Sequence, residues 1–141
     1  MKRKIFPVLL FAFVLSSGFV CTGSQIHNLR LANADLASAL NHVAQEVISL
    51  DTQGAITPQE ENSALLKVNE ATVLSDGITK CLDNVVGSAS PATCVQPLLQ
   101  GVQTDMNSLG IKSPGAQAAL SGAISAVIVI FDEFAKQGVT K

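Results

Sequence analysis

The apolar residues of the first long segment follow a helical period. They recur at spacings of three, four and seven along residues 26–50 and form one stripe, made of Leu29, Leu36, Leu40, Val43, Val47 and Leu50. This pattern is typical of an amphipathic α-helix, and the alanines between the stripe residues raise the helix propensity. Turn-forming residues follow at 51–54. The pattern therefore predicts a helix over residues 26–50.

A second helix has a strong start signal. Thr57 can cap the helix, Pro58 suits its first position, and Glu60 stands three residues after Thr57, as a capping box requires. The pattern predicts a helix from Pro58 to about Val86, followed by a loop over residues 87–91. Its expected inward residues are Leu65, Val68, Thr72, Ile78, Leu82 and Val85.

A third helix is predicted over Ala92–Leu109. Its apolar face consists of Val95, Leu98, Val102, Met106 and Leu109. Pro97 conflicts with this assignment, because proline inside a helix removes a backbone donor. We therefore expect the true first turn to start near Gln96. Gly110 then ends the helix.

The last helix, predicted over Pro114–Gln137, has no charged residue from Ser113 to Phe131. We interpret it as the central, most buried helix of the fold. The alternative is a helix that inserts into a membrane, since its length is marginal for a bilayer. Ala118, Gly122 and Ala126 form a stripe of small residues through which another backbone could approach closely. The β-branched run 126–131 leaves a strand as a local alternative.

These elements predict an all-α fold. We expect about four helices in an up-down bundle of two αα-hairpins, formed by residues 24–141 as one domain, after an N-terminal signal segment at residues 1–23.

The signal segment is indicated by three features in order. Residues 2–4 are positively charged, residues 5–15 are apolar, and small residues at 16–18 precede a polar stretch. Cleavage after Gly23 is expected to export the chain to the periplasm, the cell envelope or the outside. A membrane anchor is the weaker alternative, because the apolar run is short for a span of about 20 residues.

Cys21 offers a third fate, lipid attachment at a bacterial lipoprotein signal. Such a signal normally has a small residue directly before the cysteine and an aliphatic residue three positions before it. This chain has Val20 and Gly18 there. Lipidation of Cys21 is therefore the minor alternative.

Cys81 and Cys94 are the two cysteines that remain after cleavage. An even number of cysteines in an exported chain predicts a disulfide. A bridge that closes a loop of about 15 residues stabilises a fold by roughly 3 kcal/mol. Neither cysteine belongs to a C-x-x-C pair, so we expect a structural bridge rather than a redox or metal site.

Charge and aromatic content argue against nucleic acid as a partner. Without residues 1–23, six cations stand against 11 anions, which gives a net charge of −5. Such a domain repels phosphate backbones. It contains no Trp or Tyr, and its Phe residues are Phe131 and Phe134, so stacking platforms for bases are lacking.

Residues 49–60 partly resemble an EF-hand calcium loop. Gly54, Ile56 and Glu60 fall where the loop glycine, the hydrophobic residue and the bidentate carboxylate belong. However, Ser49 occupies the first ligand position, which leaves Asp51 as the only other carboxylate. A helix–turn–helix with a capped second helix explains the same residues, so we predict no metal and no other cofactor.

Sequence motifs typical of catalytic sites are also weak in this chain. Asp35, His42 and Glu46 share one stripe of the first helix, but no Glu-x-x-His motif would complete a metal site. Asp132 and Glu133 are adjacent and do not face each other on a helix. The chain has no G-x-S-x-G motif. We therefore expect no catalytic residues and no enzymatic activity.

Three functions remain open. The first is an exported, non-enzymatic helical envelope protein that acts as a structural or protein-interaction module for an unknown partner. The second is a membrane-active protein that inserts residues 113–131, and the third is a carrier of a small apolar ligand between its helices. The sequence does not determine the oligomeric state.

Overall fold

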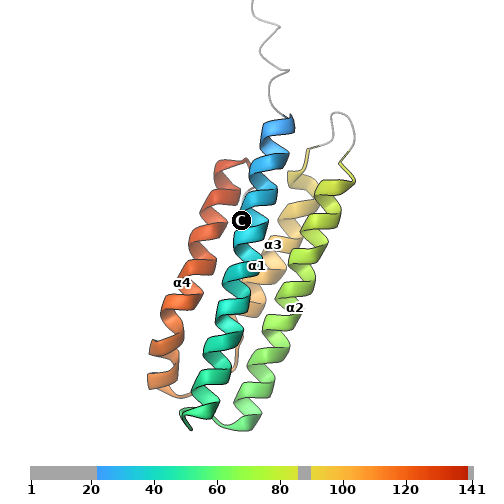
Figure 1. The fold of residues 1–141 in the computed structure, drawn as a ribbon. Coiled ribbons are helices and arrows are strands. Elements are labelled where there is room, and N and C mark those ends of the chain that lie inside the picture. The colour runs from blue at the N-terminus through green and yellow to red at the C-terminus, as the bar shows by residue number, and fades with distance from the viewer. Residues whose placement is uncertain (1–21, 86–89, 140–141) are drawn as a thin grey trace, which may run out of the picture.

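A computed structural model describes residues 22–85 and 90–139. It contains the helices α1 (Thr22–Thr52), α2 (Pro58–Asp83), α3 (Ala92–Asn107) and α4 (Pro114–Lys136), and the described residues form no strand. Successive helices run in opposite directions along one axis (Figure 1). The predicted all-α bundle is confirmed, and the alternative of a strand at 126–131 is wrong, because these residues belong to α4.

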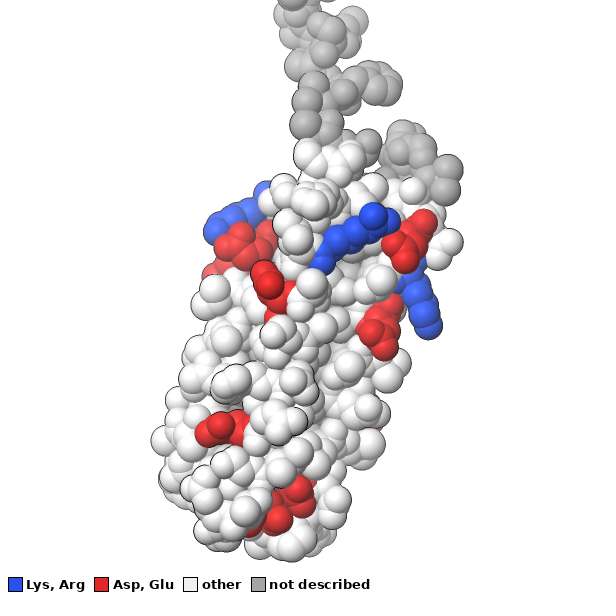
Figure 2. Space-filling view, viewed as in Figure 1, with Lys and Arg blue, Asp and Glu red and all other residues white. Residues whose placement is uncertain are grey.

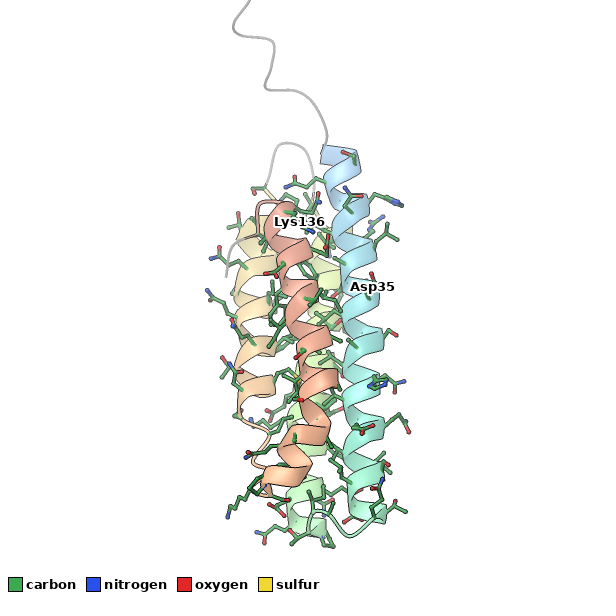
Figure 3. All side chains as sticks on the ribbon, turned by 90° about the vertical axis from the view of Figure 1, so that its left-hand side faces the viewer. Asp35 and Lys136 are labelled. Carbon is green, nitrogen blue, oxygen red and sulfur yellow. A yellow bond between two sulfur atoms is a disulfide. The ribbon has the colours of Figure 1, made fainter. Side chains whose placement is uncertain are left out.

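The helices stand in the order α4, α1, α2, α3 around the bundle axis (Figures 1 and 3). Extensive contacts join α1 to α2, α1 to α4, and α2 to α3, whereas α3 and α4 contact each other only sparsely. The bundle therefore has one loose edge, between the two helices of its second hairpin.

The predicted stripe of α1 forms the centre of the core. All six of its large apolar residues are buried, with exposed fractions between 0 and 5%. The helix is longer than predicted, since it begins at Thr22 and ends at Thr52. The predicted signal segment lies outside the described residues except for Thr22 and Gly23, which form the first two positions of α1.

α2 starts as predicted but presents a slightly different face to the core. Its buried residues are Ala64, Val68, Ala71, Ser75, Ile78 and Leu82. Leu65 and Thr72 are only half-buried, and Val85 lies beyond the helix, which ends at Asp83. Three of these buried residues, Ala64, Ala71 and Ser75, are small, and small residues allow the backbones of neighbouring helices to lie close together.

α3 contradicts the expectation that its first turn starts near Gln96. The helix begins at Ala92 and includes Pro97 in its interior. The turn before Pro97 is held in other ways: the Cys94 amide N–H donates to the Pro91 carbonyl oxygen at 3.3 Å, and Cys94 is joined to α2 by a disulfide. The face also differs, because Leu99 is buried and Leu98 only half-buried. The Cys94 hydrogen bond and the disulfide hold this turn in place, which explains how α3 tolerates a proline that lacks a backbone N–H.

α4 is not the central, most buried helix that its uncharged sequence predicted. Only 28% of its most apolar window is buried. It packs mainly against α1, so the buried residues form a single stripe, made of Ala116, Leu120, Ala123, Val127, Phe131 and Phe134. The prediction was wrong because the uncharged composition of a helix does not tell how many neighbours cover it.

A buried polar contact that the sequence did not reveal joins α1 to α2. The Asn33 side-chain amide donates to the Ser75 carbonyl oxygen at 3.0 Å and to Thr79 Oγ1 at 2.9 Å, and Ser75 Oγ donates to Asn33 Oδ1 at 3.0 Å. Asn33 and Ser75 are 5% and 2% exposed. Because a buried polar group without a partner is costly, this contact favours one register between the two helices.

We expect Asn33→Ala to lower the free energy of unfolding by about 1–3 kcal/mol, since it leaves the buried Ser75 hydroxyl without its acceptor. Urea unfolding followed by circular dichroism measures this loss. Asn69→Ala, at an exposed position of α2, is the control and should change stability by less than about 0.5 kcal/mol. Equal effects of the two substitutions would contradict the structural role of Asn33.

Candidate functional site

The structure confirms the predicted disulfide. Cys81, near the end of α2, is bonded to Cys94 in the first turn of α3, and their Cα atoms are 6.0 Å apart. The bridge covalently joins α2 to α3 and so holds the two helices together at the ends that their connecting segment links. Cys21, the candidate for lipidation, lies outside the described residues.

The turn that resembles a calcium loop is organised around a helix cap. The Glu60 carboxylate accepts hydrogen bonds from the Thr57 backbone N–H and from Thr57 Oγ1, each at 3.0 Å. It also accepts the backbone N–H of Lys112 at 3.0 Å. The carboxylate that would have ligated calcium thus joins the start of α2 to the segment that leads into α4.

These hydrogen bonds favour the charged form of Glu60. The Thr57 backbone N–H has the largest effect and that of Lys112 the next largest, and together they hold the pKa of Glu60 below its ordinary value of 4.5. The shift stabilises the cap at neutral pH.

The stripe of Asp35, His42 and Glu46 does not form a site. Asp35 and His42 are exposed on the surface of α1. Within residues 22–85 and 90–139, no group of three or more His, Cys, Asp or Glu side chains is placed to hold a metal ion. Asp35 lies at the same end of the bundle as Lys136 of α4 (Figure 3).

Lys67 forms a polar contact between α2 and α3 that the sequence did not predict. Its ammonium is 2.5 Å from Glu70 Oε2 and 3.4 Å from Asp105 Oδ1. The hydrogen bond to Glu70 is the main cause of a raised Lys67 pKa. The available signal was the position of Asp105 within the apolar face of α3, where a carboxylate requires a partner.

Two surface depressions have several apolar residues in their lining. One, of about 570 Å³, lies beside the disulfide and includes Gly77 and Val85 in its lining. The other, of about 150 Å³, lies at the loose edge between α3 and α4 and is lined in part by Met106, Leu120 and Ile124. Pockets for small ligands usually measure about 300–1,000 Å³ and enclose most of the ligand, so the depression between the helices is small for a carrier.

The side of α4 turned away from the bundle carries no charged residue between residues 113 and 131. We call it the outer face of α4, and it consists of Gly115, Ala118, Gly122, Ser125, Ala126 and Val129. All six residues are exposed; Val129 is 60% exposed, and the adjacent Ile128 is 43% exposed. Figure 2 shows white atoms over most of the length of α4, with charged atoms gathered near one end.

Charged residues stand at both ends of this face and differ in sign. Lys112 precedes α4, whereas Asp132 and Glu133 lie in its last turns. Lys136 Nζ lies 2.7 Å from Glu133 Oε1, and this hydrogen bond raises the pKa of Lys136. The outer face is therefore an uncharged strip with one cation before it and, after it, two carboxylates together with Lys136.

Comparison of the chain with protein-family models, with curated proteins and with solved structures gives no match.

We expect acid to weaken the Glu60 cap. Because the folded-state pKa is lowered, the stabilisation is complete above the ordinary pKa of 4.5 and is lost as the pH falls through the folded-state value. Glu60→Gln should therefore lower the melting temperature at neutral pH and reduce the difference between neutral and acidic melting temperatures. Glu61→Gln removes the same charge at the adjacent position and leaves the three hydrogen bonds intact. Identical pH profiles for E60Q and the unmodified chain would refute this role.

Proposed function

We propose that the chain is an exported, non-enzymatic protein whose helical bundle acts as an interaction module, with the outer face of α4 as its docking surface for a protein partner. The observation that carries this proposal is the exposure of α4. Its most apolar window has a mean hydropathy of 1.7, yet only 28% of that window is buried. Exposed apolar surface that extends along a helix commonly marks an interaction site.

The polar groups of the bundle support a non-catalytic role. Glu60 caps α2, Asn33 joins α1 to α2, and Lys67 connects α2 to α3. Each is engaged by groups of the same chain at a structural contact. The arrangement is suited to present a rigid helix surface.

Photo-cross-linking in the cells that produce the protein tests the docking surface. A photoreactive amino acid in place of Val129 should give a cross-linked protein product, because this position lies on the outer face. The matched control is Val73 of α2, which is 61% exposed against 60% for Val129. Products from position 73 and none from position 129 would overturn the proposal.

Export is examined in the same cells. Fractionation should recover the chain outside the cytoplasm, and mass spectrometry should find Ser24 as its first residue if cleavage follows Gly23. A cytoplasmic chain that retains residue 1 would contradict export.

Membrane insertion is the second candidate. Among the described helices, α4 alone is long and apolar enough to cross a bilayer by length and composition. Insertion would separate α4 from α1 and expose Phe131 and Phe134, which are 1% and 0% exposed in the bundle. This loss of core contacts favours docking of the intact bundle over insertion.

A fluorescence experiment separates the two candidates. The chain contains no Trp, so Val129→Trp provides a single reporter on α4. We expect its emission to stay unchanged when vesicles of phosphatidylethanolamine and phosphatidylglycerol are added, and Val73→Trp serves as the control. A blue shift of the α4 reporter together with quenching by brominated lipid would support insertion and oppose the docking proposal.

A further inference from the structure

We propose that the partner of the outer face of α4 is the same face of a second copy, paired antiparallel with Gly122 at the two-fold axis. This inference rests on the proposed function and adds the identity of the partner to it. Symmetric pairing of one surface patch with itself is the commonest way in which soluble chains form oligomers.

Five of the six residues of the outer face are placed symmetrically about Gly122, and Ser125 is the exception. In an antiparallel pair centred there, Ala118 faces Ala126 of the second copy, and Gly115 faces Val129. Residues 115, 118, 122, 126 and 129 follow each other at spacings of three and four, so they lie along one line of the helix. The projecting Val129 therefore meets a position without a side chain, and small residues meet small residues.

Charge complementarity selects the second copy and the antiparallel direction. With Gly122 at the axis, Lys112, two residues before α4, comes level with Asp132 of the other copy, and the neighbouring Glu133 is paired with Lys136 of its own helix. The symmetry of the pair gives this contact twice. Antiparallel helices also place the positive N-terminal end of one α4 beside the negative C-terminal end of the other. A parallel pair would instead align like charges.

Gly122 has no function in packing within one copy. A Cβ atom at this position would meet nothing within 4 Å. Glycine in a helix interior is less favourable than alanine, and here the bundle itself gives no compensation. At the axis of a helix pair, however, the missing side chain allows the two backbones to approach closely.

The composition of the face fits another protein surface better than lipid. Ser125 on the outer face and Ser121 beside it interrupt the apolar surface of α4, and Ser121 Oγ donates to the Ala118 carbonyl oxygen at 2.6 Å. A pair of helices can accommodate such small polar residues at or beside its contact. The self-pairing also keeps the core stripe of α4 against α1.

Sedimentation equilibrium of the protein, in the form in which cells process it, measures the pairing. We expect a concentration-dependent monomer–dimer equilibrium. Val129→Lys should raise the dissociation constant by about ten-fold or more, because it places a cation beside Lys112 of the second copy. Val73→Lys is the matched control: both valines are about equally exposed, and each has an aspartate three residues later, Asp132 and Asp76. It should leave the constant unchanged.

Charge reversal tests the direction of the pair. Lys112→Glu alone should weaken the dimer, and Lys112→Glu combined with Asp132→Lys should restore it, because the opposite charges then face each other again. Circular dichroism of each variant verifies that the bundle is folded. A double variant that remains as weak as the single one would refute the antiparallel register.

A cysteine at the axis provides a test that does not depend on the charged variants. Gly122→Cys, for which the structure has open space, should form a disulfide-linked dimer under oxidising conditions, whereas Val73→Cys should not. Cross-linking through any other cysteine would appear in both variants.

A chain that is monomeric at every concentration and does not cross-link through residue 122 would overturn the self-pairing. If position 129 then cross-links to a different protein in cells, the proposed function survives; if it cross-links to nothing, both fail.

Discussion

Burial of the apolar stripe of α1 is the contact on which the arrangement of the bundle depends. The stripe is covered by α2 on one side and by α4 on the other. α3 is held by α2 and by the Cys81–Cys94 disulfide, whereas α4 is attached almost entirely through α1. The second hairpin therefore has little cohesion of its own. Each of its helices is fixed by a helix of the first hairpin, and this leaves much of the surface of α4 without a neighbour.

The elements that the sequence predicted well are those that local chemistry determines. The period of α1, the capping box at Thr57 and Glu60, and the start of α4 after Ser113 all depend on residues within a few positions of each other. The disulfide was predicted from cysteine number and compartment. The all-α bundle follows from these features, because amphipathic helices joined by short connections must cover one another's apolar faces.

The errors arise where the answer depends on how helices are rotated against one another. Leu65 and Leu98 were assigned to the core by hydrophobicity, yet both are only half-buried, and the adjacent Ala64 and Leu99 are buried instead. The hydrogen-bonding partners of Asn33 and Asp105 lie on α2, so the structural role of both residues depends on how the helices are rotated against one another. The uncharged sequence of α4 predicted the central, most buried helix, although its composition carries no information on how many helices cover it. The outer face was visible in the sequence only as a stripe of small residues.

The orientation of the proposed pair constrains what happens to the N-terminal segment. The first residues of α1 and the C-terminal end of α4 lie at the same end of the bundle (Figure 1). In an antiparallel α4 pair, the two α1 N-termini therefore point away from each other. A chain held to a membrane by its first residues would place both N-termini at one surface, which this pair does not allow. Antiparallel self-pairing thus requires release of the N-terminal segment, whereas an anchored or lipidated chain would have to use its α4 surface with a different partner.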